Sequence, residues 1–209
     1  LLYVDPTILS LDFKNVLILI LVGIINIAVL WLYLIALNDD EASITVVFYQ
    51  LVPVFGLLLG YIFLDEVLTK MQIISMLIII IGTSIISFEI DNENKFKLKK
   101  KTIGLMLTAA LLWAFESTIF KVVAIEENVV RSLFWEHLTL GMIGILLLIL
   151  VKPYRHNFIQ TLKSNSRAVL GLNVLNESLY MIGNIAFSFA YLLAPIALVL
   201  LTESFQPIF

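Results

Sequence analysis

The sequence predicts an all-α integral membrane protein, and three observations support this fold class. Apolar residues make up 61% of the 209 residues and charged residues only 14%, whereas soluble domains have roughly 45–50% apolar and about 25% charged residues. The apolar residues fall in long runs, several of which contain no charge at all. These runs lack the apolar/polar alternation of barrel strands, and backbone groups in lipid must be paired internally, so the runs are expected to be helices.

Seven apolar runs define the predicted helices in chain order. They are approximately Val16–Leu37, Ala42–Leu64, Met71–Phe88, Thr102–Val123, Val129–Val151, Ala168–Leu193 and a last run that starts near Ile196. A helix of about 20 residues spans the hydrocarbon core. We therefore expect the last run, which stops at Phe209, to be incomplete and the chain to be an internal part of a longer protein. Short connections make successive helices antiparallel neighbours.

Two hydrophilic connectors carry most of the basic residues. The first covers residues 89–101 and is acidic and then rich in lysine, and the second is the polar stretch Lys152–Arg167. Cytoplasmic loops collect Lys and Arg, so the charge pattern places both connectors in the cytoplasm.

An internal repeat relates the two halves of the chain. Ala36–Phe55 aligns with Ala190–Phe209 at an offset of 154 residues, and the alignment superposes Pro53 on Pro207. Each copy contains a helix end, a turn, and a helix in which proline frees a backbone carbonyl, so we predict helix kinks at Pro53 and Pro207. Five helix starts separate the copies, and an odd number inverts the second copy. Inverted repeats with interrupted helices are typical of transporters.

Four glutamates lie near the centres of predicted helices: Glu116, Glu136, Glu177 and Glu203. Ionisable groups within a membrane are costly and therefore suggest function. One or two of them could line a central cavity and bind a cation, a substrate ammonium group or a transported proton. The structural alternative is that they are protonated or hydrogen-bonded side chains that hold helices together.

A polar stripe runs along the sixth predicted helix. Its members recur at spacings of four, three, four and four residues, which places them on one helix face, and they are Asn173, Glu177, Tyr180, Asn184 and Ser188. We favour the interpretation that this face lines a wet cavity. Hydrogen bonding to a neighbouring helix is the alternative.

Three further candidates come from the other runs. Trp113 shares a helix face with Glu116 and either stacks on a ligand or packs against a neighbour. Asn26 pairs with Tyr180 under the repeat offset, which indicates a shared central layer. Gln50 lies near the middle of its run, close to the proline.

Two other ionisable residues are expected to have structural roles. Lys121 lies near a helix end, where its long side chain is expected to reach the membrane interface. His137 is adjacent to Glu136 in the sequence. We interpret it as a histidine with its hydrogen bonds satisfied, in preference to a proton relay.

The order of several short motifs resembles the EamA domain of the drug/metabolite transporter superfamily. These motifs are Ala36-Leu37, Pro53-Val54-Phe55, Phe63–Thr69, Leu111–Phe115 with Lys121 and Trp135, and Tyr191–Pro195 through Phe209. The resemblance implies a ten-helix bundle of two inverted five-helix repeats, of which this chain holds about seven helices. The implied parts are residues 1–88 (helices 3–5 of the first repeat), the connector 89–101, and residues 102–209 (helices 6–9 of a truncated second repeat).

The sequence departs from the family pattern at three positions near these motifs. The family often has Gly where Asp65 stands, Arg where Val67 stands, and a polar residue where Val52 precedes the proline. The usual family topology also places both connectors outside the cell, which is opposite to the charge pattern. The orientation in the membrane therefore stays open.

The resemblance implies a secondary transporter that exports small metabolites, such as amino acids, or drugs by alternating access. The implied partners are a small-molecule substrate, the bilayer and, because of the carboxylates, protons; a homo-oligomer stays open. We expect a multi-pass protein of a bacterial-type plasma (inner) membrane, with no cofactor, metal or nucleic acid. With no cysteine in the chain, thiolate metal sites and disulfides are excluded.

Two alternative functions are a seven-helix receptor or photoreceptor and an intramembrane enzyme. The repeat argues against the first, as does the last run, which has no lysine for a retinal Schiff base. The chain contains no HExxH motif and no phosphate-binding glycine loop. We therefore predict that the protein is not an enzyme.

Overall fold

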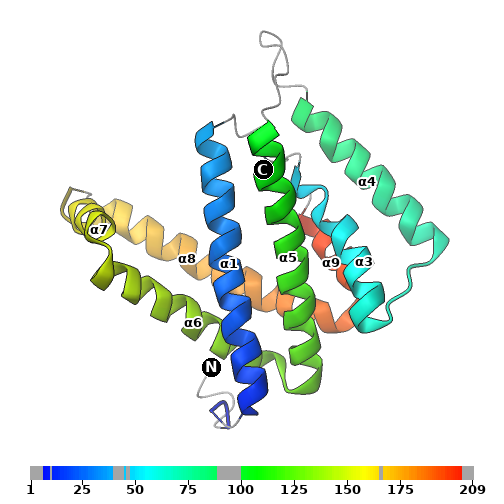
Figure 1. Cartoon of the computed structure of the whole chain (residues 1–209), viewed down its shortest axis with the longest axis horizontal. Helices are drawn as coiled ribbons and strands as arrows, with labels where there is room; N and C mark the ends of the chain where they lie inside the picture. The colour runs from blue at the N-terminus through cyan, green and yellow to red at the C-terminus, as the bar shows by residue number, and fades with distance from the viewer. Residues whose placement is uncertain are drawn as a thin grey trace.

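The computed structural model describes residues 7–9, 11–39, 45, 48–88, 100–164 and 167–203. Every regular element in these ranges is a helix, which confirms the predicted all-α fold class. The helices are α1 (Phe13–Asp39), α3 (Val52–Leu64), α4 (Lys70–Phe88), α5 (Lys100–Glu126), α6 (Val129–Leu150), α7 (Lys152–Ser164), α8 (Arg167–Leu193) and α9 (Ile196–Glu203) (Figure 1). Most ends agree with the predicted runs to within a few residues, which is the usual uncertainty of helix boundaries.

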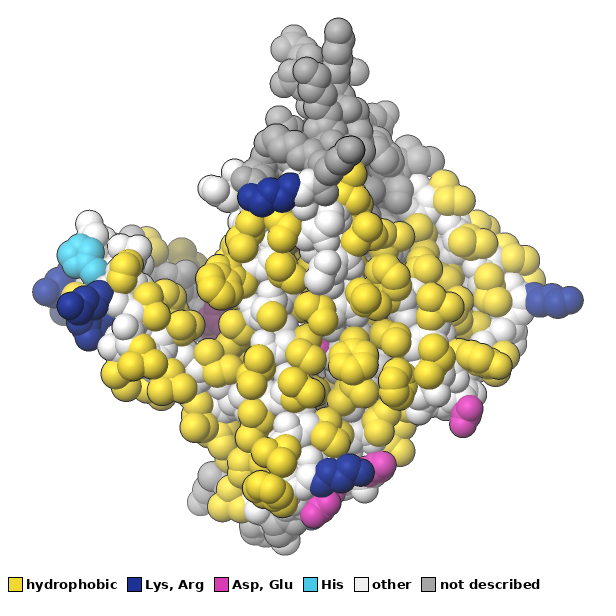
Figure 2. Space-filling view, viewed as in Figure 1, with side chains coloured by type: hydrophobic (Ala, Val, Ile, Leu, Met, Phe, Trp, Pro, Cys, Tyr) yellow, Lys and Arg dark blue, Asp and Glu magenta, His cyan; other side chains and the backbone are white. Residues whose placement is uncertain are grey.

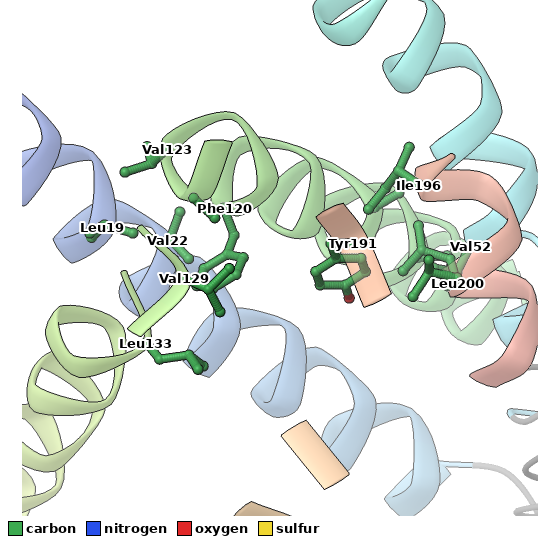
Figure 3. Close-up of a cluster of buried hydrophobic side chains, with 14 of the residues drawn as sticks. Leu19, Val22, Val52, Phe120, Val123, Val129, Leu133, Tyr191, Ile196 and Leu200 are labelled. Atoms are coloured by element: carbon green, nitrogen blue, oxygen red, sulfur yellow. The ribbon is translucent and has the colours of Figure 1, made fainter. Parts of the chain in front are cut away.

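Helix α5 occupies the centre of the bundle. It packs along α1 on one side and along α3 on the other, while α1 also contacts α6 and α3 also contacts α9 (Figure 1). Buried apolar side chains from six helices fill the contacts around α5. Figure 3 shows this cluster, which includes Leu19, Val22, Val52, Phe120, Val123, Val129, Leu133, Tyr191, Ile196 and Leu200.

The described helices have the lengths and the surface of a membrane protein. Among them, α1 over Phe13–Asn38, α5 over Lys101–Glu126 and α6 over Val129–Leu150 are long and apolar enough to cross a bilayer. Two apolar segments are shorter, Val52–Leu64 and Lys70–Gly82. Figure 2 shows hydrophobic side chains over most of the visible face, with Lys, Arg, Asp and Glu mainly near its edges. Side chains of this kind can face lipid without cost.

The predicted helix Ala42–Leu64 is not one continuous helix. Phe48 and Tyr49 are helical, a turn follows at positions 50 and 51, and α3 begins at Val52. Pro53 therefore lies in the first turn of α3, and the interruption that was expected at this proline lies directly before it. Proline is favoured at the start of a helix because the N–H that it lacks would have no intrahelical partner there. The matching prediction for Pro207 lies outside the described residues.

The polar connector Lys152–Arg167 contains a helix that we did not predict. Residues Lys152–Ser164 form α7, which directly follows α6 and precedes α8 in the chain. Its apolar residues Tyr154, Phe158 and Leu162 recur every four positions, which places them on one face. The pattern is short and was concealed by the polar composition of the segment.

Candidate functional site

A cavity of about 410 Å³ lies among α1, α5, α6, α8 and α9. Its wall combines polar and aromatic side chains: Asn26, Trp113, Glu116, Ser117, Phe120, Glu136, Tyr180, Gly183, Asn184, Phe187, Ser188, Tyr191 and Thr202. Sites for small molecules have volumes of about 300–1,000 Å³ and a few polar groups in an otherwise apolar wall. The cavity has the size and the lining of such a site.

Helix α5 supplies one wall of the cavity from a single face. Trp113, Glu116, Ser117 and Phe120 follow the helical spacing of three and four residues. Glu116 and Ser117 are 7% and 3% exposed. The Trp113 ring packs edge-on against Tyr49, with ring centroids 5.1 Å apart and planes at 84°. Trp113 therefore both packs against a neighbour and faces the cavity, so the two interpretations of this residue are compatible.

Helix α6 contributes a buried carboxyl group. Glu136 is 5% exposed and lines the cavity. The nearest charged-type contact is His137 Nδ1 at 4.0 Å from Glu136 Oε2, which is too long for a hydrogen bond. Among the described residues, the Glu136 carboxyl group accepts no hydrogen bond from the protein. A buried polar group normally has a hydrogen-bond partner, and for Glu136 this partner would have to come from within the cavity.

The imidazole ring of His137 has a polar contact at each nitrogen. Nδ1 lies 2.9 Å from Leu133 O, and because a carbonyl oxygen can only accept, Nδ1 carries the proton. The Asn184 amide nitrogen then donates to Nε2 at 3.2 Å. The prediction of a satisfied histidine is confirmed, and the Asn184 side chain is held in place at the cavity wall.

The polar stripe of α8 divides into two parts. Tyr180, Asn184 and Ser188 line the cavity, and Ser188 Oγ donates to Asn184 O at 2.8 Å. Asn173 and Glu177 lie further towards the start of α8, are exposed, and line a separate surface depression. The expectation of one continuous wet face therefore applies to the second half of the helix only.

The structure brings six of the predicted candidates together and leaves three of them elsewhere. Those in the cavity wall are Asn26, Trp113, Glu116, Glu136, Tyr180 and Asn184. Gln50 is 2% exposed but does not line the cavity, and Asn173 and Glu177 occupy the depression. The side chain of Glu203 lies outside the described part of the structure. Among the described residues, no group of acidic and histidine side chains is arranged to hold a metal ion.

Sequence reasoning missed three of the five aromatic residues in the wall. Phe120, Phe187 and Tyr191 line the cavity together with the hydroxyl-bearing Thr202. An aromatic residue in an apolar run has the same pattern whether it packs or lines a cavity. The one usable signal was spacing, because Phe120 follows Glu116 by four residues on the same face.

Lys121 does not extend to the membrane interface, and that prediction is wrong. The side chain is buried, and its Nζ forms an ion pair with Glu66 and donates to Ala194 O at 2.7 Å. Glu66 Oε2 also accepts from Ile196 N at 2.7 Å, at the first residue of α9. A buried ammonium group is retained when a carboxylate compensates its charge. The ion pair and its hydrogen bonds join the α3–α4 connector, α5 and the α8–α9 turn.

Residues 1–88 match the family described as the EamA-like transporter family, and this segment includes α1, α3 and α4. No curated protein matches the chain. The match confirms the resemblance that was inferred from the motifs around Pro53 and Phe63–Thr69. Residues 1–88 are thus similar to the EamA-like transporter family, and this similarity together with the long apolar helices indicates an integral, multi-pass membrane protein of the transporter type.

Proposed function

We propose that the protein is a secondary transporter that exports small metabolites, such as amino acids or related compounds, or drugs, by alternating access. The cavity is the observation that carries this proposal. Two buried carboxyl groups, two amides and several hydroxyl groups face it within a bundle of apolar helices. Polar groups at such a position are costly in a membrane and mark substrate or ion pathways.

The proposed substrate contacts are the candidates that line the cavity. Asn26, Trp113, Tyr180 and Asn184 would orient the substrate, while Glu116 and Glu136 would hold a positive charge, either on the substrate or as a transported proton. Glu177 and Asn173 are proposed to belong to a route along the outer half of α8. In this scheme the carboxylates couple substrate movement to protons.

We also propose that the chain contains parts of two inverted five-helix repeats. Asn26 and Tyr180, which the offset of 154 residues relates, both line the cavity from different helices, α1 and α8. Inverted-repeat transporters place the substrate site at the interface between the repeats. A shared position at the cavity supports this arrangement for residues 1–88 and 102–209.

Transport by purified protein in proteoliposomes tests the proposal. Labelled amino acids and drugs would be supplied with and without an imposed pH gradient, and protein-free liposomes would give the background. We expect uptake of one compound class above background, faster with the gradient. Glu136→Gln should reduce this uptake, whereas Glu126→Gln should not, because Glu126 is exposed at the end of α5.

Three possible results of this experiment test different parts of the proposal. Uptake that ignores the gradient would retain the transporter and remove the proton coupling. Normal uptake by a Glu177→Gln variant would remove the outer half of α8 from the route. If no compound of the panel crosses the membrane faster than in empty liposomes, secondary transport is contradicted.

A further inference from the structure

We infer that the cavity selects organic cations, namely small molecules with an ammonium group attached to an apolar or aromatic body. This inference rests on the proposed transport function and specifies the substrate class for the same site. The charge of the cavity wall is the first observation that supports it. The described residues of the lining include two glutamates, Glu116 and Glu136, and no Lys, Arg or His.

The basic residues closest to this wall in sequence have partners elsewhere. Lys121 follows the lining residue Phe120 but pairs with Glu66. Arg131 Nη1 lies 4.0 Å from Glu127 Oε2, one turn before it on the chain. The ring of His137 contacts Leu133 O through Nδ1 and the Asn184 amide through Nε2. Among the described residues, no lysine, arginine or histidine side chain therefore lines the cavity.

The environment of Glu136 also favours a positively charged ligand. Its side chain is 5% exposed, lines the cavity and accepts no hydrogen bond from the described residues. A carboxylate at such a site needs a charged or hydrogen-bonding partner, since burial without one is costly. An ammonium group in the cavity supplies both the countercharge and N–H donors. A carboxylate ligand would instead meet two like charges, which disfavours its binding.

The remainder of the wall suits the apolar body of such a cation. Five aromatic side chains line the cavity: Trp113, Phe120, Tyr180, Phe187 and Tyr191. The rings of Phe120 and Tyr191 contact each other at 6.2 Å between centroids. Aromatic faces attract cations within about 6 Å, and they also pack against a ligand ring. A volume of about 410 Å³ accommodates a compound with one or two rings.

A charge series on one ring system tests the inference. The full chain in detergent would be titrated with labelled tryptamine, and competed with tryptophol (neutral), tryptophan (zwitterion) and indole-3-propionate (anion). We expect tryptamine to bind roughly tenfold or more tightly than tryptophol, with the anion weakest. Glu136→Gln should remove most of this difference, because it weakens tryptamine binding far more than tryptophol binding. Glu136→Asp should retain the preference, and Glu126→Gln should behave as the parent.

Thermal unfolding and gel filtration of each variant would show that the protein is folded, so a lost preference reports on charge. Equal binding of tryptamine and tryptophol, or tighter binding of the anion, would overturn the inference. If proteoliposomes transport a neutral or anionic compound but not tryptamine, the charge preference fails while the transporter stands. If no compound binds and none is transported, both proposals fail.

Discussion

At the scale of single residues, Glu66 joins three segments that are far apart in the sequence. Its carboxylate pairs with Lys121 on α5 and accepts from Ile196 N at the start of α9. An acidic group at a helix N-terminus also interacts favourably with the unpaired N–H groups and the helix dipole. One side chain thereby neutralises a buried cation and caps a helix.

Removing Glu66 should therefore destabilise the protein strongly. Glu66→Ala leaves the Lys121 ammonium group buried without a carboxylate, and we expect a loss of about 3–5 kcal/mol. The double variant Glu66→Ala with Lys121→Met removes both charges and should recover most of this loss. Unfolding in detergent micelles, measured for the two single variants and the double variant, gives the coupling energy. Additive effects would show that the ion pair is not the source of the stability.

Asp65 has the backbone conformation for which glycine is best suited. Its φ of 51° lies in the left-handed region, where it ends α3 as the C-cap residue. Asp tolerates this conformation better than most residues, but Gly adopts it without steric cost. We expect Asp65→Gly to raise the free energy of unfolding by up to about 1 kcal/mol and Asp65→Val to lower it. Thermal melts of both variants check the sign, and a stabilising Val would contradict the argument. The same conformation explains why the related family often has Gly at this position.

At the scale of helices, α3 and α9 approach closely because two glycines face the contact. A Cβ atom at Gly56 would lie 2.6 Å from Leu200 Cδ1, and one at Gly60 would lie 2.7 Å from Ile196 Cγ2 and 3.0 Å from Glu66 Oε2. Glycines four residues apart are a common basis for tight helix packing in membranes. The backbone of α3 therefore forms part of the contact surface with α9.

We predict that Gly60→Val disrupts this contact and the nearby ion pair. The new side chain would displace Ile196 and the Glu66 carboxylate, so the yield of monodisperse protein and its melting temperature should fall. Gly82→Val on α4 is the matched control, because a Cβ atom there meets nothing within 4 Å. Both variants add the same β-branched side chain to a helix. Equal losses for the two would mean that helix propensity, and not the contact with α9, is responsible.

Helix α7 has the pattern of a helix that lies in the membrane interface. Apolar residues recur every fourth position, and the helix also contains Lys152, Arg155, His156 and Lys163 but no acidic residue. Figure 2 shows Lys, Arg and His side chains gathered over this part of the molecule. Such helices bury their apolar face at the boundary between headgroups and acyl chains.

This placement predicts different environments for two positions on α7. Because the chain contains no cysteine, a polarity-sensitive dye can be attached to a single Phe158→Cys or Gln160→Cys substitution. Phe158 lies on the apolar face and Gln160 on the opposite side. In liposomes, the dye at position 158 should emit at shorter wavelength and be protected from an aqueous quencher. Identical emission and quenching at the two positions would contradict the interfacial placement.

Features that depend on residues close together in the sequence could be predicted from the sequence, whereas features that depend on residues far apart in the sequence could not. The helices follow from composition, because a long apolar run in lipid has no other way to pair its backbone groups. The break before Pro53 and the helix α7 depend on local patterns that were present but weak. The partner of Lys121 lies 55 residues away in the sequence, so no local pattern reveals it. Whether a polar residue of α8 lines the cavity or the outer depression depends on which helices lie beside that half of α8, and the spacing of the residues does not reveal this.

At the scale of the whole molecule, the cavity is lined by residues from both sides of residue 88, where the match to the family ends. The segment that matches the family contributes Asn26, whereas all other lining residues come from α5, α6, α8 and α9. A substrate in this cavity therefore contacts helices from both proposed repeats. Relative movement of the repeats would change the access to the cavity, which is what alternating access requires.

Two serines on α8 allow this movement to be followed. Each donates its hydroxyl to the carbonyl oxygen four residues earlier, Ser178 to Val174 O and Ser188 to Asn184 O. Ser188 is 2% exposed and lines the cavity, whereas Ser178 is exposed in the outer depression. Ser188→Cys should react slowly with a membrane-impermeant thiol reagent, because the reagent enters only when the cavity is open. A ligand that occupies the cavity should slow this reaction further and leave Ser178→Cys unaffected. If Ser188→Cys reacts quickly and no transported compound slows the reaction, this cavity is not the site through which the substrate passes.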